Sequence, residues 1–253
     1  MEPSEQNVPI DFANMKIKDL VNENFHTAEL FAKFGIDFCC NGNRLIEAAL
    51  KEKKISKSRF IEEYKKIDTA RSAEDFHYSE WGLDFISKYI INNHHKYVKG
   101  AIPSITAHLQ KIQNAHGDKY TFIKEIENTF ARVAAEMTSH MKKEEKTLFP
   151  LIKYLVDSNR LKEKPKTRGY GSVQNPIKQM KAKHVSAGNA MKVIRTLTDD
   201  YSLPENYCAT FQITYNELAQ FEKDLHKHMH LENNILFARA IALEENLING
   251  IFE

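Results

Sequence analysis

The stretches HMKKEEKTLF at residues 140–149 and HMHLENNILF at residues 228–237 decide the predicted fold. They share a His, a Met, a Glu, a Leu and a Phe at the same offsets and begin 88 residues apart. In each stretch the His and the Glu stand four residues apart, so on an α-helix both side chains lie on one face and can reach one point. A repeat of this kind indicates a duplicated pair of helices.

The spacing of the two His-x-x-x-Glu pairs carries little weight by itself. With eleven His and 34 acidic residues in 253 positions, chance predicts about 1.5 such pairs. The shared residues around the pairs are the stronger signal, and the repeat extends upstream, where His95 precedes His184 by 89 residues. Each half of the duplicated region therefore supplies one lone His and one His-x-x-x-Glu pair.

The composition is that of a globular protein with few turns. Of 253 residues, 42% are apolar and 28% are charged, and nine Gly and seven Pro disfavour a turn-rich all-β chain. Lys and Arg total 36 against 34 Asp and Glu, a balance that argues against nucleic-acid binding. No apolar stretch approaches the roughly 18 residues of a membrane helix. Because the first residues are acidic and polar, we expect no signal peptide.

Three cysteines form no disulfide framework, because their number is odd and Cys39 and Cys40 are adjacent. We therefore expect a reducing, cytoplasmic location. Cys39 and Cys40 are expected in a loop at the start of a helix, where the helix N-terminus lowers a thiol pKa and favours the thiolate. The alternative is that they are small buried hydrophobic residues. Cys208 is expected in the core.

Helical periodicity extends along most of the chain and predicts an all-α fold. In the first part, one helix is expected from Ile17 to Phe34, ended by Gly35, followed by shorter helices over residues 44–53 and 58–67.

The polar segment 68–75 is the expected boundary between a small helical domain, residues 1–70, and a larger domain, residues 71–253. The larger domain is predicted to be a four-helix bundle. Its helices are expected over residues 80–115, 120–156, 175–198 and 203–246. Pro103 is expected to kink the first of these and Pro150 to disturb the second.

Apolar neighbours at helical spacing indicate which histidines face the core of this bundle. Those with such neighbours are His140, His184 and His228. In the first helix the periodicity does not choose between His94 and His95. His226 and His230 form a rival His-x-x-x-His pair, but the residues on their face are polar, so we expect that pair to be exposed to solvent.

Four imidazoles and two carboxylates inside an apolar bundle are costly unless a cation neutralises and ligates them. This donor set, which contains no thiolate, suits iron or manganese better than structural zinc. Six protein ligands are too many for one metal ion with an open position, but they fit two ions bridged by Glu144 and Glu232. The sequence therefore predicts a dinuclear site. A purely structural interpretation, in which buried His and Glu side chains pair with each other, stays open.

The order of a lone His, His-x-x-x-Glu, a second lone His and a second His-x-x-x-Glu resembles the hemerythrin-like di-iron domains. The stretch GIDFCCNG at residues 35–42 further resembles the iron–sulfur cluster repair di-iron proteins (the RIC family), which carry a small Cys-Cys domain before such a bundle. The chain departs from the family pattern at Asn41, where Gly is common. It also departs at Val185, where an acidic residue often stands, and at Ala238, which replaces a proline.

The resemblance implies two non-haem iron ions per chain, bridged by the two glutamates. The implied ligands are His95, His140, Glu144, His184, His228 and Glu232. It also implies a homodimer and a function in repairing iron–sulfur clusters damaged by nitric oxide or oxidative stress. Damaged iron–sulfur proteins would be the clients, and Cys39 and Cys40 would transfer iron or electrons or contact a client.

A second function remains open from the sequence. A hemerythrin-like sensor, store or reductase would take oxygen or nitric oxide as its small ligand, and it would keep its activity without residues 1–70. Four histidines align with the pattern here, whereas the oxygen carriers of the family have five, which favours the repair proteins.

Overall fold

The computed structural model describes residues 12, 14–68, 77–166, 171–205 and 207–252. The chain divides into two compact units, Met1–Glu80 and Trp81–Glu253. The boundary predicted at residues 68–75 lies, apart from residue 68, outside the described residues. The described part contains helices and no strand, as the periodicity predicts, and an antiparallel bridge joins Lys16 to Leu45. No helix in it is long and apolar enough to cross a membrane.

The small unit consists of four short α-helices and a 3-10 turn around an aromatic core. The elements are α1 (Ile17–Glu23), α2 (Thr27–Lys33), α3 (Ile46–Glu52), α4 (Lys57–Asp68) and η1 (Tyr78–Glu80). Phe31 and Phe60 are fully buried, with ring centroids 5.6 Å apart, and Phe12 meets Phe60 edge-to-face at 5.5 Å. Aromatic side chains bury large apolar areas, which compensates for the small size of this unit.

The single helix predicted from Ile17 to Phe34 is wrong, because it breaks at Asn24. The backbone of Asn24 is extended, and its side-chain oxygen accepts a hydrogen bond from the backbone N–H of His26 at 2.9 Å. Asn competes in this way with helical hydrogen bonding, so α1 ends and α2 begins three residues later. The predicted end of this helical region at Gly35 is confirmed. Gly35 has a φ of 63°, and the N–H of Ile36 donates to the carbonyl of Phe31 at 2.8 Å, a typical glycine C-cap.

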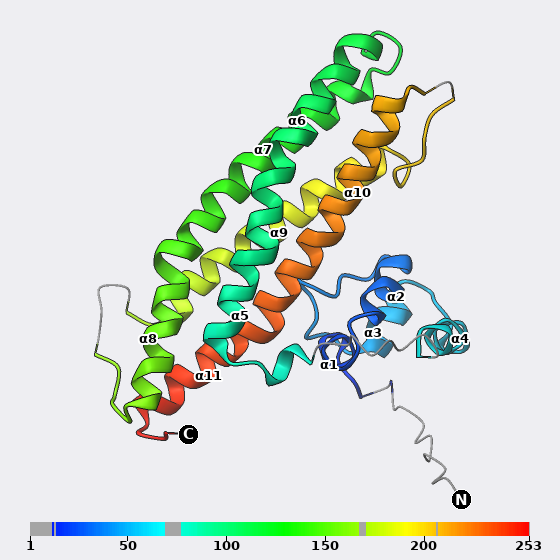
Figure 1. Ribbon diagram of the computed structural model, residues 1–253. Helices are drawn as coiled ribbons and strands as arrows, with labels where there is room; N and C mark the ends of the chain where they lie inside the picture. The colour runs from blue at the N-terminus through cyan, green and yellow to red at the C-terminus, as the bar shows by residue number, and fades with distance from the viewer. Residues whose placement is uncertain (1–11, 13, 69–76, 167–170, 206, 253) are drawn as a thin grey trace, which may run out of the picture. The chain divides into compact units, whose positions relative to one another are not determined.

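The large unit is a bundle of four long helices, three of which contain a π-helical segment. The first is α5 (Leu83–Ile90), η2 (Ile91–His95) and α6 (Lys96–His116); the second is α7 (Phe122–Lys143), η3 (Glu144–Leu148) and α8 (Phe149–Arg160); the third is α9 (Gln174–Leu197); and the fourth is α10 (Ala209–His230), η4 (Leu231–Leu236) and α11 (Phe237–Ile248). Successive long helices run in opposite directions (Figure 1). Near one end α6 packs on α7 and α10, and near the other α8 packs on α5 and α11.

The fourth long helix begins at Ala209, whereas the sequence predicted that it begins at Leu203. Residues Asp199, Asp200 and Tyr201 all have positive φ, between 47° and 60°, which reverses the chain directly after α9. Non-glycine residues adopt this region at a cost, so other contacts must hold the turn. Cys208, in extended conformation, then caps α10.

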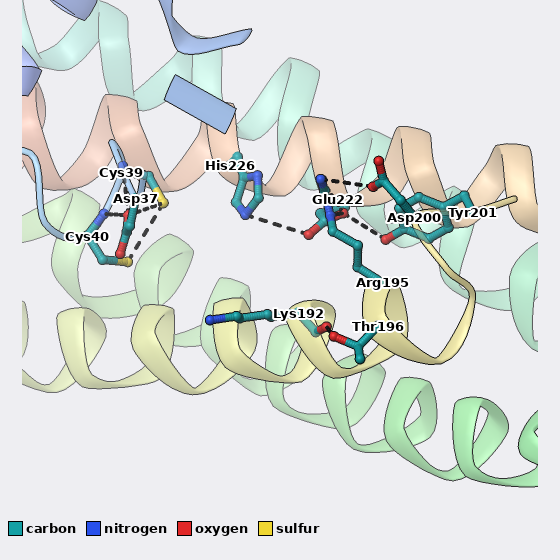
Figure 2. Close-up of polar contacts among 10 residues, drawn as sticks. All are labelled: Asp37, Cys39, Cys40, Lys192, Arg195, Thr196, Asp200, Tyr201, Glu222 and His226. Atoms are coloured by element: carbon teal, nitrogen blue, oxygen red, sulfur yellow. Dashed lines mark hydrogen bonds and ion pairs between the residues drawn. The ribbon is translucent and has the colours of Figure 1, made fainter. Parts of the chain in front are cut away.

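Glu222 on α10 provides those contacts (Figure 2). Its Oε2 accepts hydrogen bonds from the Tyr201 hydroxyl at 2.7 Å and from Arg195 Nη2 at 2.8 Å. Arg195 Nη1 also lies 3.1 Å from the carboxylate of Asp200. The buried carboxylate therefore ties the end of α9 and the left-handed turn to α10.

Candidate metal centre

The six residues predicted as ligands come from all four long helices and meet in the core of the bundle. All are 2% exposed or less: His95, His140, Glu144, His184, His228 and Glu232. Their side chains form two groups that could each hold a metal ion. One group joins His95 and His228 to both glutamates, and the other joins His140 and His184 to the same two glutamates. Each group therefore takes one imidazole from each half of the bundle.

The carboxylate of Glu144 lies between two imidazoles of the first half. Its Oε1 is 3.0 Å from His140 Nε2, and its Oε2 is 3.4 Å from His95 Nε2. Glu232 repeats the arrangement in the second half. Its Oε1 is 3.1 Å from His228 Nε2, and its Oε2 is 3.0 Å from His184 Nε2. Each carboxylate thus faces two imidazoles, one from each group. A carboxylate that bridges two metal ions requires this arrangement.

Polar atoms of this cluster lack the hydrogen bonds that buried groups normally make. Both oxygens of Glu144 and of Glu232, and the Nε2 atoms of His95 and His228, are buried without a hydrogen-bond partner. An unsatisfied buried carboxylate is costly, and a cation removes the cost by coordination. The residues present therefore fit a dinuclear metal centre with imidazole and carboxylate ligands.

The electrostatics of the cluster favour positive charge. Burial opposes the charged form of His140, but Glu144 and Glu232 outweigh it and raise the pKa of His140 to about 10. Burial likewise opposes ionisation of Glu232, but the surrounding histidines, His228 first, hold the pKa of that carboxyl well below its usual range. The two carboxylates thus create a negative potential in the cluster, which favours a bound proton or metal cation there.

The structure brings His95, and not His94, into the cluster, which resolves the choice that periodicity left open. His94 Nδ1 instead lies 2.8 Å from the carboxylate of Asp224. The ring of His94 stacks on His228, with centroids 5.6 Å apart and an interplanar angle of 12°. His94 thus packs behind a predicted ligand without entering either group.

The π-helical segments occur where the long helices carry these side chains. The segment η2 ends with His94 and His95, η3 begins at Glu144, and Glu232 is the second residue of η4. A π turn contains more residues than an α turn, so it changes the direction in which the following side chains point. Such segments are frequent at functional sites, and helical periodicity does not predict them.

A second set of residues orients the lone histidines and was missed from the sequence. The Nδ1 atom of His95 lies 2.8 Å from Glu145 Oε1, and Lys99 Nζ lies 2.7 Å from the same oxygen. The Nδ1 atom of His184 lies 3.0 Å from Asn233 Oδ1. An acceptor on Nδ1 fixes the ring so that Nε2 faces the metal. The signal was present, because Glu145 and Asn233 each directly follow a repeated Glu.

The last residue of each repeated stretch also contacts a lone histidine. Phe149 stacks on His95 with centroids 5.7 Å apart and an interplanar angle of 15°, and Phe237 stacks on His184 at 6.1 Å and 3°. The repeated Phe therefore has the same task in both halves, since it covers one face of the imidazole and excludes water from it.

The expectation that His226 and His230 form an exposed pair is wrong for His230, which is 1% exposed. Its Nδ1 accepts a hydrogen bond from the side-chain amide of Asn234 at 3.0 Å. His226 is partly exposed and lies 4.0 Å from Glu222 Oε1. Neither belongs to the two metal-binding groups described above.

A groove of about 480 Å³ between α7 and α9 reaches His140. Ser139 and Lys143 line it from α7, and Met180 and Lys183 line it from α9. The group containing His140 and His184 therefore adjoins a space large enough for water or a diatomic molecule.

In the small unit, Cys39 and Cys40 lie in the loop before α3, with their sulfur atoms 3.9 Å apart (Figure 2). The predicted position at a helix N-terminus is wrong, because α3 begins only at Ile46. The thiolate expectation fails for Cys39. Its hydrogen bond with Cys40, its burial and the nearby charge of Asp37 all raise the pKa of the Cys39 thiol.

Cys208 does not lie in the core. It is partly exposed at the start of α10, and its sulfur lies 3.3 Å from His116 Nε2. Extended capping residues sit at the end of a helix rather than against its buried face, which explains the difference from the prediction.

Comparison with known proteins gives two family matches along the chain. Residues 88–240 match the hemerythrin HHE cation binding domain, and residues 13–68 match a domain of unknown function, DUF542. The first match contains all six residues of the cluster. The second contains Cys39 and Cys40.

Similar proteins cover nearly the full length of the chain. A probable iron-sulfur cluster repair protein of Haemophilus influenzae is 28% identical over 235 residues, which is 92% of this chain and 99% of that protein. The iron-sulfur cluster repair protein YtfE of Yersinia pseudotuberculosis is 29% identical over 234 residues, with the same coverage of 92% and 99%. YtfE of Yersinia pestis is similar to the same extent.

Proposed function

The chain belongs to the family of hemerythrin HHE cation binding domains, and we propose that it is a di-iron protein that repairs iron–sulfur clusters damaged by nitric oxide or oxidative stress. One observation carries the proposal. A buried cluster of four imidazoles and two carboxylates occurs in a chain that aligns with 99% of the length of relatives named as repair proteins. That alignment includes the small Cys-Cys unit as well as the bundle.

In this proposal two iron ions per chain are ligated by the six clustered residues. His95 and His228 would hold one ion, His140 and His184 the other, and Glu144 and Glu232 would bridge both. The donor set supports this assignment, because imidazole and carboxylate suit iron and the shared carboxylates suit a pair of ions. A bridged ferrous pair can exchange electrons, bind a diatomic molecule, or give up iron to a damaged cluster.

The surrounding residues would control how firmly iron is held. Glu145 and Asn233 fix the rings of His95 and His184, and this orientation strengthens binding. The groove beside His140 supports a route for iron or a small ligand on one side of the centre. Iron donation needs both properties, since the metal must stay bound in the resting protein and still leave when a client takes it.

The proposal includes a cytoplasmic site of action, where the reducing environment would keep the cysteines reduced. Damaged iron–sulfur proteins are the proposed clients, and the homodimer implied by the family resemblance remains part of the proposal. Cys39 and Cys40 would assist the transfer of iron or contact the client.

The test combines metal content with repair activity. Protein purified without oxygen is analysed for iron and then added to an iron–sulfur enzyme whose cluster has been degraded with nitric oxide. The variant Glu144→Gln, Glu232→Gln keeps the size of both side chains and removes the bridging charges. Glu125→Gln, at an exposed position of α7, is the matched control.

We expect about two irons per chain and reactivation of the enzyme in wild type and in Glu125→Gln, and loss of both in the double variant. Negligible iron after reconstitution with ferrous salt would overturn the di-iron site. Bound iron with reversible binding of oxygen or nitric oxide, but without reactivation, would favour the sensor, store or reductase instead.

A further inference from the structure

The loop between α2 and α3 contains a cluster of metal-binding side chains that shares no residue with the centre in the bundle. Asp37, Cys39 and Cys40 place one carboxylate oxygen and two sulfur atoms within 4.8 Å of one another. Cys39 Sγ lies 3.3 Å from Asp37 Oδ1 and 3.9 Å from Cys40 Sγ. Three donor groups thus converge within four residues of sequence.

The backbone of the loop holds these groups in place. Asp37 Oδ1 accepts hydrogen bonds from the backbone N–H of Cys39 at 3.0 Å and of Cys40 at 2.8 Å. Its other oxygen, Oδ2, accepts a hydrogen bond from the side-chain amide of Asn41 at 2.7 Å. These bonds form an Asx turn that turns both cysteines toward the carboxylate, as Figure 2 shows.

The distances match those of a tetrahedral metal site. Two metal–sulfur bonds of about 2.3 Å at a tetrahedral angle separate the sulfurs by about 3.8 Å, and the observed separation is 3.9 Å. A sulfur and a carboxylate oxygen bound to the same ion lie about 3.6 Å apart, and Cys39 Sγ and Asp37 Oδ1 are 3.3 Å apart. The side chains therefore need only small movements to bind one ion.

We propose that Asp37, Cys39 and Cys40 form a mononuclear site for a thiophilic divalent metal ion, with a fourth coordination position left open. The chemistry is that of Zn²⁺, Fe²⁺ or Co²⁺ with two thiolates and one carboxylate. Binding releases the two thiol protons as the two metal–sulfur bonds form, and no electron is transferred. Only the identity of the natural ion rests on the proposed function, which would make it ferrous iron.

The charge around Cys39 supports this assignment. The proximity of Cys40, burial and the charge of Asp37 raise the pKa of the Cys39 thiol, because a lone thiolate there would face other negative groups. A bound cation reverses the sign of this effect, since negative neighbours stabilise it.

Cobalt provides the test, because thiolate ligation of Co²⁺ produces charge-transfer absorption that imidazole and carboxylate ligands do not produce. Co²⁺ is titrated to excess into the full chain, loaded with iron, reduced and kept without oxygen, because Co²⁺ binds a given site more tightly than Fe²⁺ and displaces it from the loop. We expect about one cobalt per chain with this absorption. The centre in the bundle contains no thiolate, so it does not contribute to the signal.

Variants assign the signal to the loop. Cys39→Ser and Cys40→Ser should each abolish the dithiolate spectrum. Asp37→Asn keeps the acceptor of the Asx turn and should weaken Co²⁺ binding at least about tenfold. Cys208→Ser, which removes the cysteine of the other unit, should bind Co²⁺ like wild type, and the iron content of every variant reports whether the protein is folded.

Three results would overturn the proposal. The first is no charge-transfer absorption in the reduced wild type, and the second is absorption that persists when Cys39→Ser and Cys40→Ser are combined in one variant. The third is absorption that disappears in Cys208→Ser. An unchanged affinity in Asp37→Asn would overturn the three-ligand site. The cobalt signal depends only on thiolates and cobalt, and the repair assay measures reactivation of a client enzyme. The loop site can therefore be refuted while repair activity is observed, and repair activity can be absent while the loop binds cobalt.

Discussion

In the first half of the bundle a carboxylate, Glu145, orients the lone histidine, whereas in the second half an amide, Asn233, has this position. The two halves correspond in their His and Glu side chains of the cluster and in the phenylalanine stacked on each lone imidazole. A carboxylate acceptor makes an imidazole a stronger electron donor to a metal than an amide does. The two halves therefore share the clustered residues and differ in the residues that orient them.

The two groups of clustered residues also differ in their access to solvent. His184, held by the amide, belongs to the same group as His140, which the groove between α7 and α9 reaches. The His95 group is backed by Glu145 and its ion pair with Lys99. The two proposed metal positions would therefore be unequal, and an ion at His140 and His184 should be the first to leave.

The largest expected effect is on metal content. Removing a residue that belongs to both groups should release more metal than removing a residue that belongs to one group. Glu232 belongs to both groups, so Glu232→Gln should reduce the bound metal from about two ions per chain to nearly none. His184 belongs to one group only, so His184→Gln should retain about one ion. Elemental analysis of anaerobic protein measures both, with His226→Gln as the control. Loss of both ions in His184→Gln would mean that the positions are not separate.

The stacked phenylalanines test whether the halves are equivalent in packing. Phe149→Ala and Phe237→Ala should each lower the free energy of unfolding by about 3–5 kcal/mol, because each leaves a cavity beside an imidazole. Denaturant unfolding of the metal-free protein measures the loss. Val193→Ala, at a position that is 41% exposed, should change it by less than about 0.5 kcal/mol. A cost near this control at either Phe would refute the matching roles.

Exchanging the orienting residues should exchange the properties of the two metal positions. A chelator should remove metal from wild type in two phases, with the His140 and His184 position first. Asn233→Asp should slow the first phase and Glu145→Gln should accelerate the second, each by about 10- to 100-fold. Single-phase release in wild type, or rates unaffected by both substitutions, would contradict the asymmetry.

The smallest effect is a pH dependence of the metal-free protein. The pKa of His140 is raised to about 10 by Glu144 and Glu232 against the effect of burial. The stability that its charge contributes is therefore complete below its unfolded pKa of about 6.5 and is lost as the pH rises through about 10. Between about pH 7.5 and 8.5, the contribution of His140 to the free energy of unfolding should fall by at most about 1.4 kcal/mol.

Metal ligation removes this dependence, because the bound imidazole is neutral. Unfolding of the metal-free protein, of the iron-loaded protein and of metal-free His140→Gln across this range provides the comparison. A flat profile in the metal-free wild type, or an equal slope in His140→Gln, would show that His140 is not the group responsible.

Much of the bundle could be predicted because its information is local. The periodicity of apolar residues predicted the four long helices and the core-facing His184, and the repeated stretches identified His140, Glu144, His228 and Glu232. The break at Asn24 and the left-handed turn at Asp199–Tyr201 were not predicted. There, side-chain hydrogen bonds override the helical pattern, and one of those partners, Glu222, is distant in sequence.

By itself, the sequence predicted the all-α fold, the repeat and five of the six residues that converge in the core, because a helix of known period fixes which side chains share a face. Only the tertiary structure decided between His94 and His95, buried His230, and paired the lone histidines with Glu145 and Asn233. It also divided the six residues into two groups that each combine both halves. These features depend on how one helix lies against another, and contacts between residues about fifty or more positions apart leave no periodic trace in a single sequence.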